Sequence, residues 1–158
     1  MGGTPPVTQP YRHFIQDIRL VQVAARDVAW HRRKGALPSV SIMVIPRVQP
    51  PTWSREDNGF LVEFVGELLG HPLGAKTSST RTAWFRLKAT MMVTYAVDEA
   101  TTVWSKDPEF ARFVDVYARS SGFLHMWPYF RELCSSATAR MGLAPVFLDT
   151  VVIPPANP

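Results

Sequence analysis

The side chains that could bind a metal or act as a nucleophile are few in this sequence. It has one cysteine, Cys134, and four histidines, which are His13, His31, His71 and His125. A metal site draws on such residues at short, recurring spacings. No histidine here has such a spacing from another histidine or from the cysteine. We therefore predict that the chain has no metal site and uses no cofactor.

The positions of these residues favour structural roles. His71 lies between a glycine and a proline, which is typical of a turn, and His125 lies off the apolar stripe that begins at Phe123, as a surface or capping histidine would. Cys134 falls on that stripe, where a buried, inert thiol is more common than a nucleophile. The chain also lacks the GxSxG, GxxxxGK[ST], GxGxxG and HExxH motifs of common enzyme classes. We therefore predict no catalytic residues and a protein that is not an enzyme.

The overall composition suits one domain with a partly apolar surface. The chain has 158 residues, of which 19% are charged. That share is below the usual quarter, so more of the surface is expected to be apolar. Such surface is typical of proteins that associate with copies of themselves or bind apolar partners. A well-covered monomer would have the same composition, so this feature does not decide between the two.

The net charge of +4 leaves a second class of function open. The densest basic cluster is His31, Arg32, Arg33 and Lys34, beside a predicted turn at Gly35. A solvated hairpin end is the simplest interpretation of such a cluster. The alternative hypothesis is a basic binding module or adaptor for nucleic acid or an acidic protein partner, although no nucleic-acid-binding motif is present.

The ends of the chain are rich in proline. We expect residues 1–12 and 154–158 to be flexible tails around a single domain at 13–153. A single cysteine allows no internal disulfide, which favours a reducing cytoplasm. We also expect no signal peptide and no membrane span, because no apolar run approaches the roughly 20 residues that a span requires.

Four segments have the residue patterns of strands. They are predicted at 14–30, 40–45, 60–69 and from residue 83 to 95. In the fourth, apolar residues from Phe85 to Tyr95 alternate with polar ones, which predicts a half-buried antiparallel strand. We expect Pro46 to end the second strand and, with Pro50 and Pro51, to form a stiff connection.

The period of the apolar residues then changes to that of helices. Asp107 and Pro108 match an N-cap and a first helical residue. The apolar residues that follow at spacings of three and four are Phe110, Phe113, Val114 and Tyr117. We expect Gly122 to end this helix and Gly142 to end a second one, which contains a proline that either begins or kinks it. Residues 146–153 are predicted to be extended or irregular. Strands followed by helices predict an α+β fold.

Three segments resemble the SecB family of export chaperones. Residues 127–132, Trp-Pro-Tyr-Phe-Arg-Glu, resemble the family's Phe-Pro-Tyr-Ala-Arg-Glu segment. Residues 141–148, Met-Gly-Leu-Ala-Pro-Val-Phe-Leu, resemble its Arg-Gly-x-Phe-Pro-x-Leu-x-Leu stretch, and residues 14–20 resemble its first strand. The resemblance covers about 14–153. It implies a four-stranded antiparallel sheet with a long helix packed on it.

The resemblance also implies a function. SecB chaperones are holdases that use no ATP and bind unfolded polypeptide in apolar grooves between the sheet, a crossover loop and the helices. They assemble as a dimer of dimers through the long helices. On this chain the loop would be residues 46–58. The residues implied for the client-binding groove are Trp53, Phe64, Phe123, Met126, Trp127 and Tyr129. Those implied for the oligomer interface or the core are Phe130, Leu133, Ala137 and Met141.

The chain differs from typical family members in its charge and its end. Typical SecB chaperones are acidic and are recognised by SecA through an acidic sheet face, whereas this sequence places Arg86 and Lys88 on the outward face of a strand. We also expect it to lack the family's C-terminal helix and acidic tail. In both respects it resembles the SecB-like chaperones linked to toxin–antitoxin systems. The clients implied are therefore exported preproteins or a dedicated antitoxin.

Overall fold

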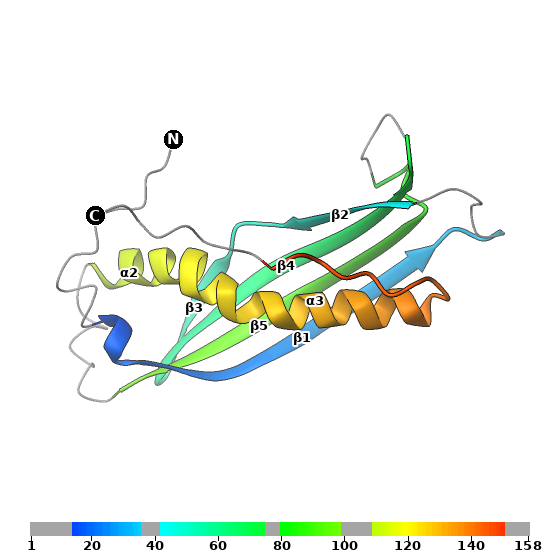
Figure 1. The fold of residues 1–158 in the computed structure, drawn as a ribbon. Coiled ribbons are helices and arrows are strands. Elements are labelled where there is room, and N and C mark those ends of the chain that lie inside the picture. Colours follow the sequence, from blue (N-terminus) through cyan, green and yellow to red (C-terminus); the bar gives the residue numbers. More distant parts are fainter. Residues whose placement is uncertain (1–13, 36–41, 75–79, 99–108, 151–158) are drawn as a thin grey trace.

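The structure is a computed structural model that describes residues 14–35, 42–74, 80–98 and 109–150. Its strands are β1 (Ile18–Arg32), β2 (Ile42–Val48), β3 (Thr52–Glu56), β4 (Gly59–Pro72) and β5 (Phe85–Val97). They form one antiparallel sheet in the order β1-β5-β4-β2, and β3 also pairs with β4. β2 pairs with residues 66–72 of β4 and β3 with residues 59–63. The two short strands therefore share one edge of a sheet that is four strands wide (Figure 1).

The alternation of the two central strands builds the core. On β4, Phe60, Val62 and Phe64 are fully buried, and on β5 so are Leu87 and Val93. The residues between them are more exposed, which confirms the period of two that the sequence predicted. One face of the sheet is therefore apolar and must be covered by another layer.

Three predictions about the edge strands were wrong. Pro46 lies inside β2 and does not end it, because an edge strand tolerates a missing N–H group. Residues 52–56 of the predicted connection form β3, a short strand of mostly polar residues whose period gave no strand signal. The first strand also begins later than predicted, since Phe14 lies in a short helical turn before β1. The first residues of the predicted second strand lie outside the described ranges.

The helices follow one another without interruption. They are α2 (Phe110–Tyr117), the π-helical segment η3 (Ala118–Gly122) and α3 (Phe123–Arg140). All four apolar residues of the predicted stripe on α2 are buried, as expected. The predicted N-cap, Asp107 with Pro108, lies outside the described residues.

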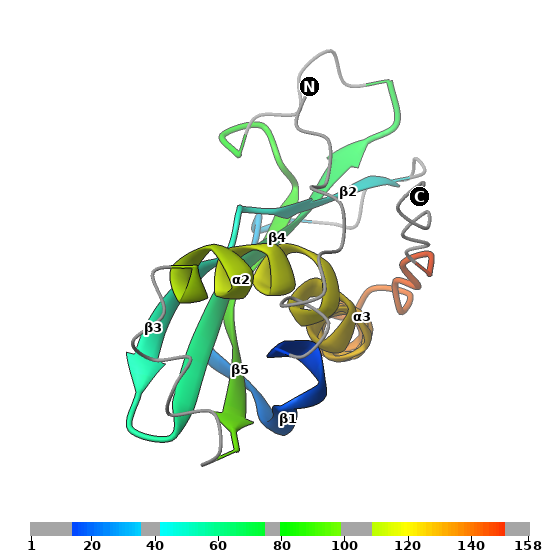
Figure 2. The same ribbon diagram turned by 90° about the vertical axis from the view of Figure 1, so that its left-hand side faces the viewer.

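Gly122 does not end a helix, contrary to the prediction. A Cβ atom at this position would lie 3.3 Å from the ring of Phe64 and 3.5 Å from the hydroxyl of Tyr95, so the glycine lets the helix approach the sheet closely. The π-helical segment adds a residue to the turn, and α2 and α3 point in different directions on either side of it (Figure 2).

Gly142 ends α3 as predicted. It has a φ of 75°, and the N–H groups of Gly142 and Leu143 donate to the carbonyls of Ala139 and Thr138 at 3.0 Å. This pattern is a Schellman motif, in which glycine adopts the left-handed conformation at lowest cost. Pro128 lies inside α3. The described part of the last predicted segment, up to residue 150, is irregular.

The helices cover one face of the sheet and leave the other face open. α3 contacts β1, β4 and β5, and no described helix lies on the opposite face (Figure 2). On that open face Arg26 donates to Glu63 at 2.7 Å, Arg86 pairs with Glu67, and Lys88 is exposed. No described helix combines the length and apolar character that crossing a membrane would require.

Candidate functional site

The residues with catalytic potential are separated from one another, and His31 is exposed at the end of β1. Among the described residues, no three His, Cys, Asp or Glu side chains are close enough to hold a metal ion. Cys134 is buried, and this burial raises the pKa of its thiol to about 12. A protonated, inaccessible thiol is inert, as the sequence predicted. His13 lies outside the described residues.

His71 is not a turn residue, contrary to the prediction. It lies inside β4 opposite Met43 and is fully buried. Neither of its ring nitrogens has a hydrogen-bond partner. The strand continues through it to Pro72, its last residue, which lies beyond the end of the pairing with β5, so the missing N–H group of the proline breaks no bond there.

His125 is half-buried in a cluster of aromatic rings, where a surface position was predicted. Its Nδ1 lies 2.9 Å from the hydroxyl of Tyr95, and its ring centroid is 6.4 Å from that of Tyr117. Burial lowers the pKa of His125 below its usual value of 6.5 and raises the pKa of Tyr95. The neutral imidazole can therefore accept a hydrogen bond from the tyrosine hydroxyl.

This arrangement predicts a loss of stability in mild acid. The unfolded chain protonates His125 near its usual pKa of 6.5, whereas the folded chain does so only at lower pH. The resulting stability is complete above 6.5 and is lost as the pH falls toward the lowered value. We expect Tm to decrease between about pH 7.5 and about pH 5.5, and to decrease less in a His125→Gln variant. Thermal denaturation at each pH measures both, and equal slopes for the two proteins would contradict the assignment.

One apolar groove lined by described residues lies at the β2 edge of the sheet. We call it the loop groove; its lining residues are Val48, Gln49, Pro50, Pro51, Phe64, Arg119 and Phe123. Its volume is about 300 Å³. Phe64 is fully buried beneath it, and Phe123 from the start of α3 is half-buried. The wall opposite these rings is the short connection between β2 and β3, which two consecutive prolines make stiff.

The charge at this groove is already balanced within the chain. Arg119 is the charged lining residue, and its Nε donates to Asp115 at 3.0 Å, one helical turn away. The groove therefore offers aromatic and aliphatic surface with a neutralised ion pair beside it. Such a site accepts apolar side chains and selects little else about the ligand.

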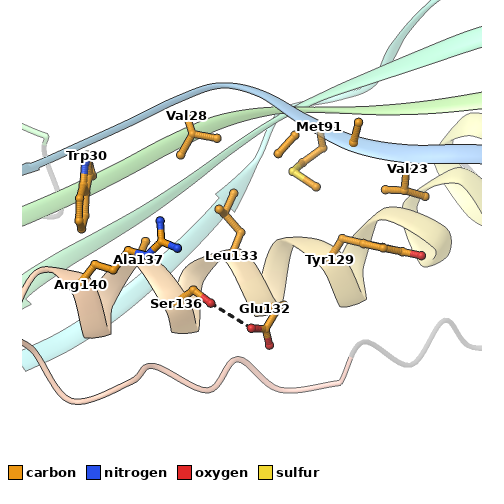
Figure 3. A pocket seen from close by; sticks show the side chains of 12 residues that line it. Val23, Val28, Trp30, Met91, Tyr129, Glu132, Leu133, Ser136, Ala137 and Arg140 are labelled. Atoms are coloured by element: carbon orange, nitrogen blue, oxygen red, sulfur yellow. Dashed lines mark hydrogen bonds between the residues drawn. The ribbon is translucent and has the colours of Figure 1, made fainter.

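The second groove lies between α3 and the β1 edge. We call it the α3 groove; its lining residues are Val23, Ala24, Ala25, Val28, Trp30, Met91, Tyr129, Glu132, Leu133, Ser136, Ala137 and Arg140 (Figure 3). Its volume is about 530 Å³. Large apolar side chains are left exposed along it, with 45% of Val28, 46% of Trp30 and 52% of Tyr129 accessible. This much uncovered apolar surface on one edge marks an interaction site.

A segment of the chain lies along α3 and closes part of its surface. Residues 143–150 follow the helix back, and the indole N–H of Trp127 donates to the carbonyl of Asp149 at 3.0 Å. The backbone N–H of Val146 donates to the hydroxyl of Thr138, also at 3.0 Å. Leu148 is buried in the core. This segment therefore fixes the indole of Trp127, a residue that was predicted to line the client-binding groove.

The predicted site residues are distributed over both grooves and the core. Phe64 and Phe123 line the loop groove, and Tyr129 lines the α3 groove. Trp53 is half-buried against Phe110, with ring centroids 6.2 Å apart, while Met126 is fully buried and Trp127 is 8% exposed. Of the residues predicted for an oligomer interface or the core, Leu133 and Ala137 line the α3 groove, and Phe130 and Met141 are buried in the core.

Sequence reasoning missed residues on both grooves. The prolines and Val48 of the loop groove fall within the predicted crossover loop, 46–58, but were not named as lining residues. Val28 and Trp30 were assigned to a strand without a role. Two irregularities in the pairing of β1 with β5, after Leu20 and after Arg26, obscured which side chains face the helices. The one signal available in the sequence was Trp30, a large aromatic residue at the end of a predicted strand.

Comparisons with known proteins support the fold. No protein-family model matches the chain, and no curated protein sequence matches it. Among solved structures it is similar to the Mycobacterium tuberculosis Rv1957 SecB-like chaperone in complex with a ChAD peptide from the HigA1 antitoxin. The TM-score is 0.73 at 14% identity, and the match covers 92% of this chain and 99% of that one. The chain therefore has the SecB-like fold, an α+β fold with a long helix on an antiparallel sheet, as the sequence predicted.

Proposed function

We propose that this chain, whose fold is that of SecB-like chaperones, is a holdase that binds unfolded or aggregation-prone polypeptide without ATP. The observation that carries the proposal is the loop groove, an accessible apolar site bounded by stiff prolines and aromatic rings. A groove of this chemistry recognises apolar side chains of an extended chain and is indifferent to their order. The chain works as a binding protein and not as an enzyme.

The client that we propose is a dedicated one of the antitoxin type. The similar solved structure contains a peptide from an antitoxin, and the loop groove is large enough for a few apolar side chains of such a segment. Clients for export are the second possibility within the same function. Recognition by SecA is not part of the proposal, because Arg86 and Lys88 lie on the open face of the sheet.

The proposal includes assembly into a homo-oligomer, a dimer of dimers, in the cytoplasm. The exposed apolar side chains of β1 and α3 support self-association, since a monomer would leave them in water. β1 is also an edge strand of 15 residues, which other chains can approach.

The basic cluster gives little support to a nucleic-acid adaptor. Arg32 donates from Nη1 to the carbonyl of Met141 at 2.7 Å, and its guanidinium lies over the ring of Trp84. Arg33 donates from Nη2 to the carbonyl of Arg81 at 2.6 Å. Two cations of the cluster therefore hold the end of β1 against α3 and the turn before β5, which is a structural role.

The test is suppression of aggregation. We expect the protein to reduce light scattering by a thermally unfolded model protein at near-stoichiometric ratios, equally well with and without ATP. Bovine serum albumin at the same concentration controls for crowding. Scattering that is unchanged at an excess of this protein would refute the holdase, and suppression only with ATP would refute the proposed mechanism.

A further inference from the structure

Basic side chains gather at one place on the open face of the sheet. Glu67 of β4 lies opposite Lys88 of β5 and, on its other side, opposite Arg47 of β2. Arg86, which faces the same way as Lys88 on β5, forms an ion pair with Glu67. Directly opposed residues of neighbouring strands project from the same face of a sheet. Three basic side chains therefore surround one carboxylate, and we call these four residues the basic patch.

The basic patch presents its cations to the solvent. The side chain of Glu67 is 13% accessible, whereas that of its partner Arg86 is 39% accessible. Lys88 is exposed, unlike the other residues of β5. Lys88 also forms no ion pair or hydrogen bond within the described ranges of the chain. Its ammonium group is therefore available to an external anion.

The neighbouring charges on the same face have no such surplus. Arg26 of β1 donates to Glu63 at 2.7 Å and to Asp27 at 3.0 Å, so one cation meets two carboxylates. Its positive charge is therefore offset within the chain. The basic patch differs from this neighbouring group in having more cations than carboxylates.

The composition of the open face favours a polypeptide over a nucleic acid. The outward residues of β4 between 61 and 71 and of β5 between 86 and 96 include no Phe, Tyr or Trp on which a base could stack. Glu67 at the centre of the patch would repel a continuous row of phosphates. Separate carboxylates can instead each meet one cation, which is the pairing that arginine and lysine form most readily in proteins.

The spacing of the cations matches an extended partner. Arg86 and Lys88 are alternate residues of one strand, so their Cα atoms are about 7 Å apart. Alternate residues of an extended acidic segment have the same separation and also project from one side of the segment. Two such carboxylates can therefore meet the two cations at the same time.

We propose that the basic patch is a docking site for an acidic segment of another polypeptide, which lies extended along β5 and places alternate carboxylates on Arg86 and Lys88. Charge complementarity defines this partner. The site lies on the face of the sheet opposite the helices, whereas the loop groove is lined by Phe123 of α3. The inference is therefore separate from the proposed function, and both sites can be occupied together.

The test is fluorescence anisotropy at low salt with a short labelled peptide in which Glu alternates with Ala. We expect this peptide to bind, the same peptide with Gln in place of Glu not to bind, and the affinity to fall as salt is added. Lys88→Glu should weaken binding by about tenfold, and Lys88→Gln by about threefold. Circular dichroism checks that each variant is folded.

Arg112→Glu is the matched control. It changes the net charge as Lys88→Glu does, but at an exposed position of α2 in the helix layer. We therefore expect it to leave the dissociation constant of the Glu peptide unchanged.

Three results would overturn the inference. The first is a Glu peptide that does not bind at low salt. The second is an equal loss in Lys88→Glu and Arg112→Glu, which would reduce the effect to net charge. The third is a single-stranded RNA oligonucleotide that binds more tightly than the peptide and is released by Lys88→Glu. Because the peptide has no large apolar side chains, failure here would leave the holdase proposal intact.

Discussion

Replacing Phe130 by alanine is expected to lower the free energy of unfolding by about 3 to 5 kcal/mol. Phe130 is fully buried on α3, and its ring lies over the backbone of Gly66 on β4. A Cβ atom at residue 66 would collide with that ring, so the contact brings the long helix close to the sheet. The truncation leaves a cavity between the two layers. Urea denaturation monitored by circular dichroism measures the change.

A double-mutant cycle separates this contact from a general loss of packing. Gly66→Ala alone should destabilise the protein, because the added methyl group meets the ring of Phe130. In the Phe130→Ala background the same change should cost much less, since the space is empty. Leu124→Ala, an exposed position on the same helix, should change the free energy by less than about 0.5 kcal/mol. Additive effects of the two core changes would contradict the docking contact.

Replacing Phe123 by alanine is expected to weaken client binding by about ten- to a hundredfold, if the loop groove is the site of the proposed holdase. The ring of Phe123 stacks on Trp127 with centroids 5.4 Å apart and meets Phe64 edge-on at 6.4 Å. Both neighbours fix its orientation, so it presents a rigid apolar surface to a ligand. Fluorescence anisotropy of a labelled, unfolded peptide with several apolar residues measures the dissociation constant.

Leu124 again provides the matched control. It is the next residue along α3, it is 43% exposed, and it is not among the residues that line the loop groove. Leu124→Ala should therefore leave the dissociation constant unchanged. Equal affinities for the wild type and the Phe123→Ala variant, both folded by circular dichroism, would place the client elsewhere. Equal losses in both variants would point to a nonspecific apolar effect.

The loop groove and the α3 groove are well separated in the fold. They lie at opposite edges of the sheet, the loop groove at β2 and the α3 groove at β1, and α3 contributes to both. A substitution in one groove is therefore expected to leave the lining of the other groove unchanged. This separation makes client binding and self-association testable independently of each other.

The sequence by itself determined the elements whose burial pattern is local. The alternation on β5, the stripe on α2 and the end of α3 at Gly142 could all be predicted, because each depends on residues close together in the chain. The resemblance of residues 127–132 to one family then pointed to the arrangement of the layers. The inert character of Cys134 followed from its position on an apolar stripe.

Only the tertiary structure decided the features that depend on residues distant in the chain. β3 is a strand because β4 offers it an edge, although its own residues are polar. Gly122 lies inside a continuous helix that packs closely on the sheet, where a Cβ atom would lie 3.3 Å from the ring of Phe64 and 3.5 Å from the hydroxyl of Tyr95. The α3 groove exists because β1 and α3 leave apolar side chains uncovered, and the loop groove because the connection after β2 lies across from Phe64 and Phe123. No period in the sequence encodes which face remains uncovered, since that depends on the packing of every other element.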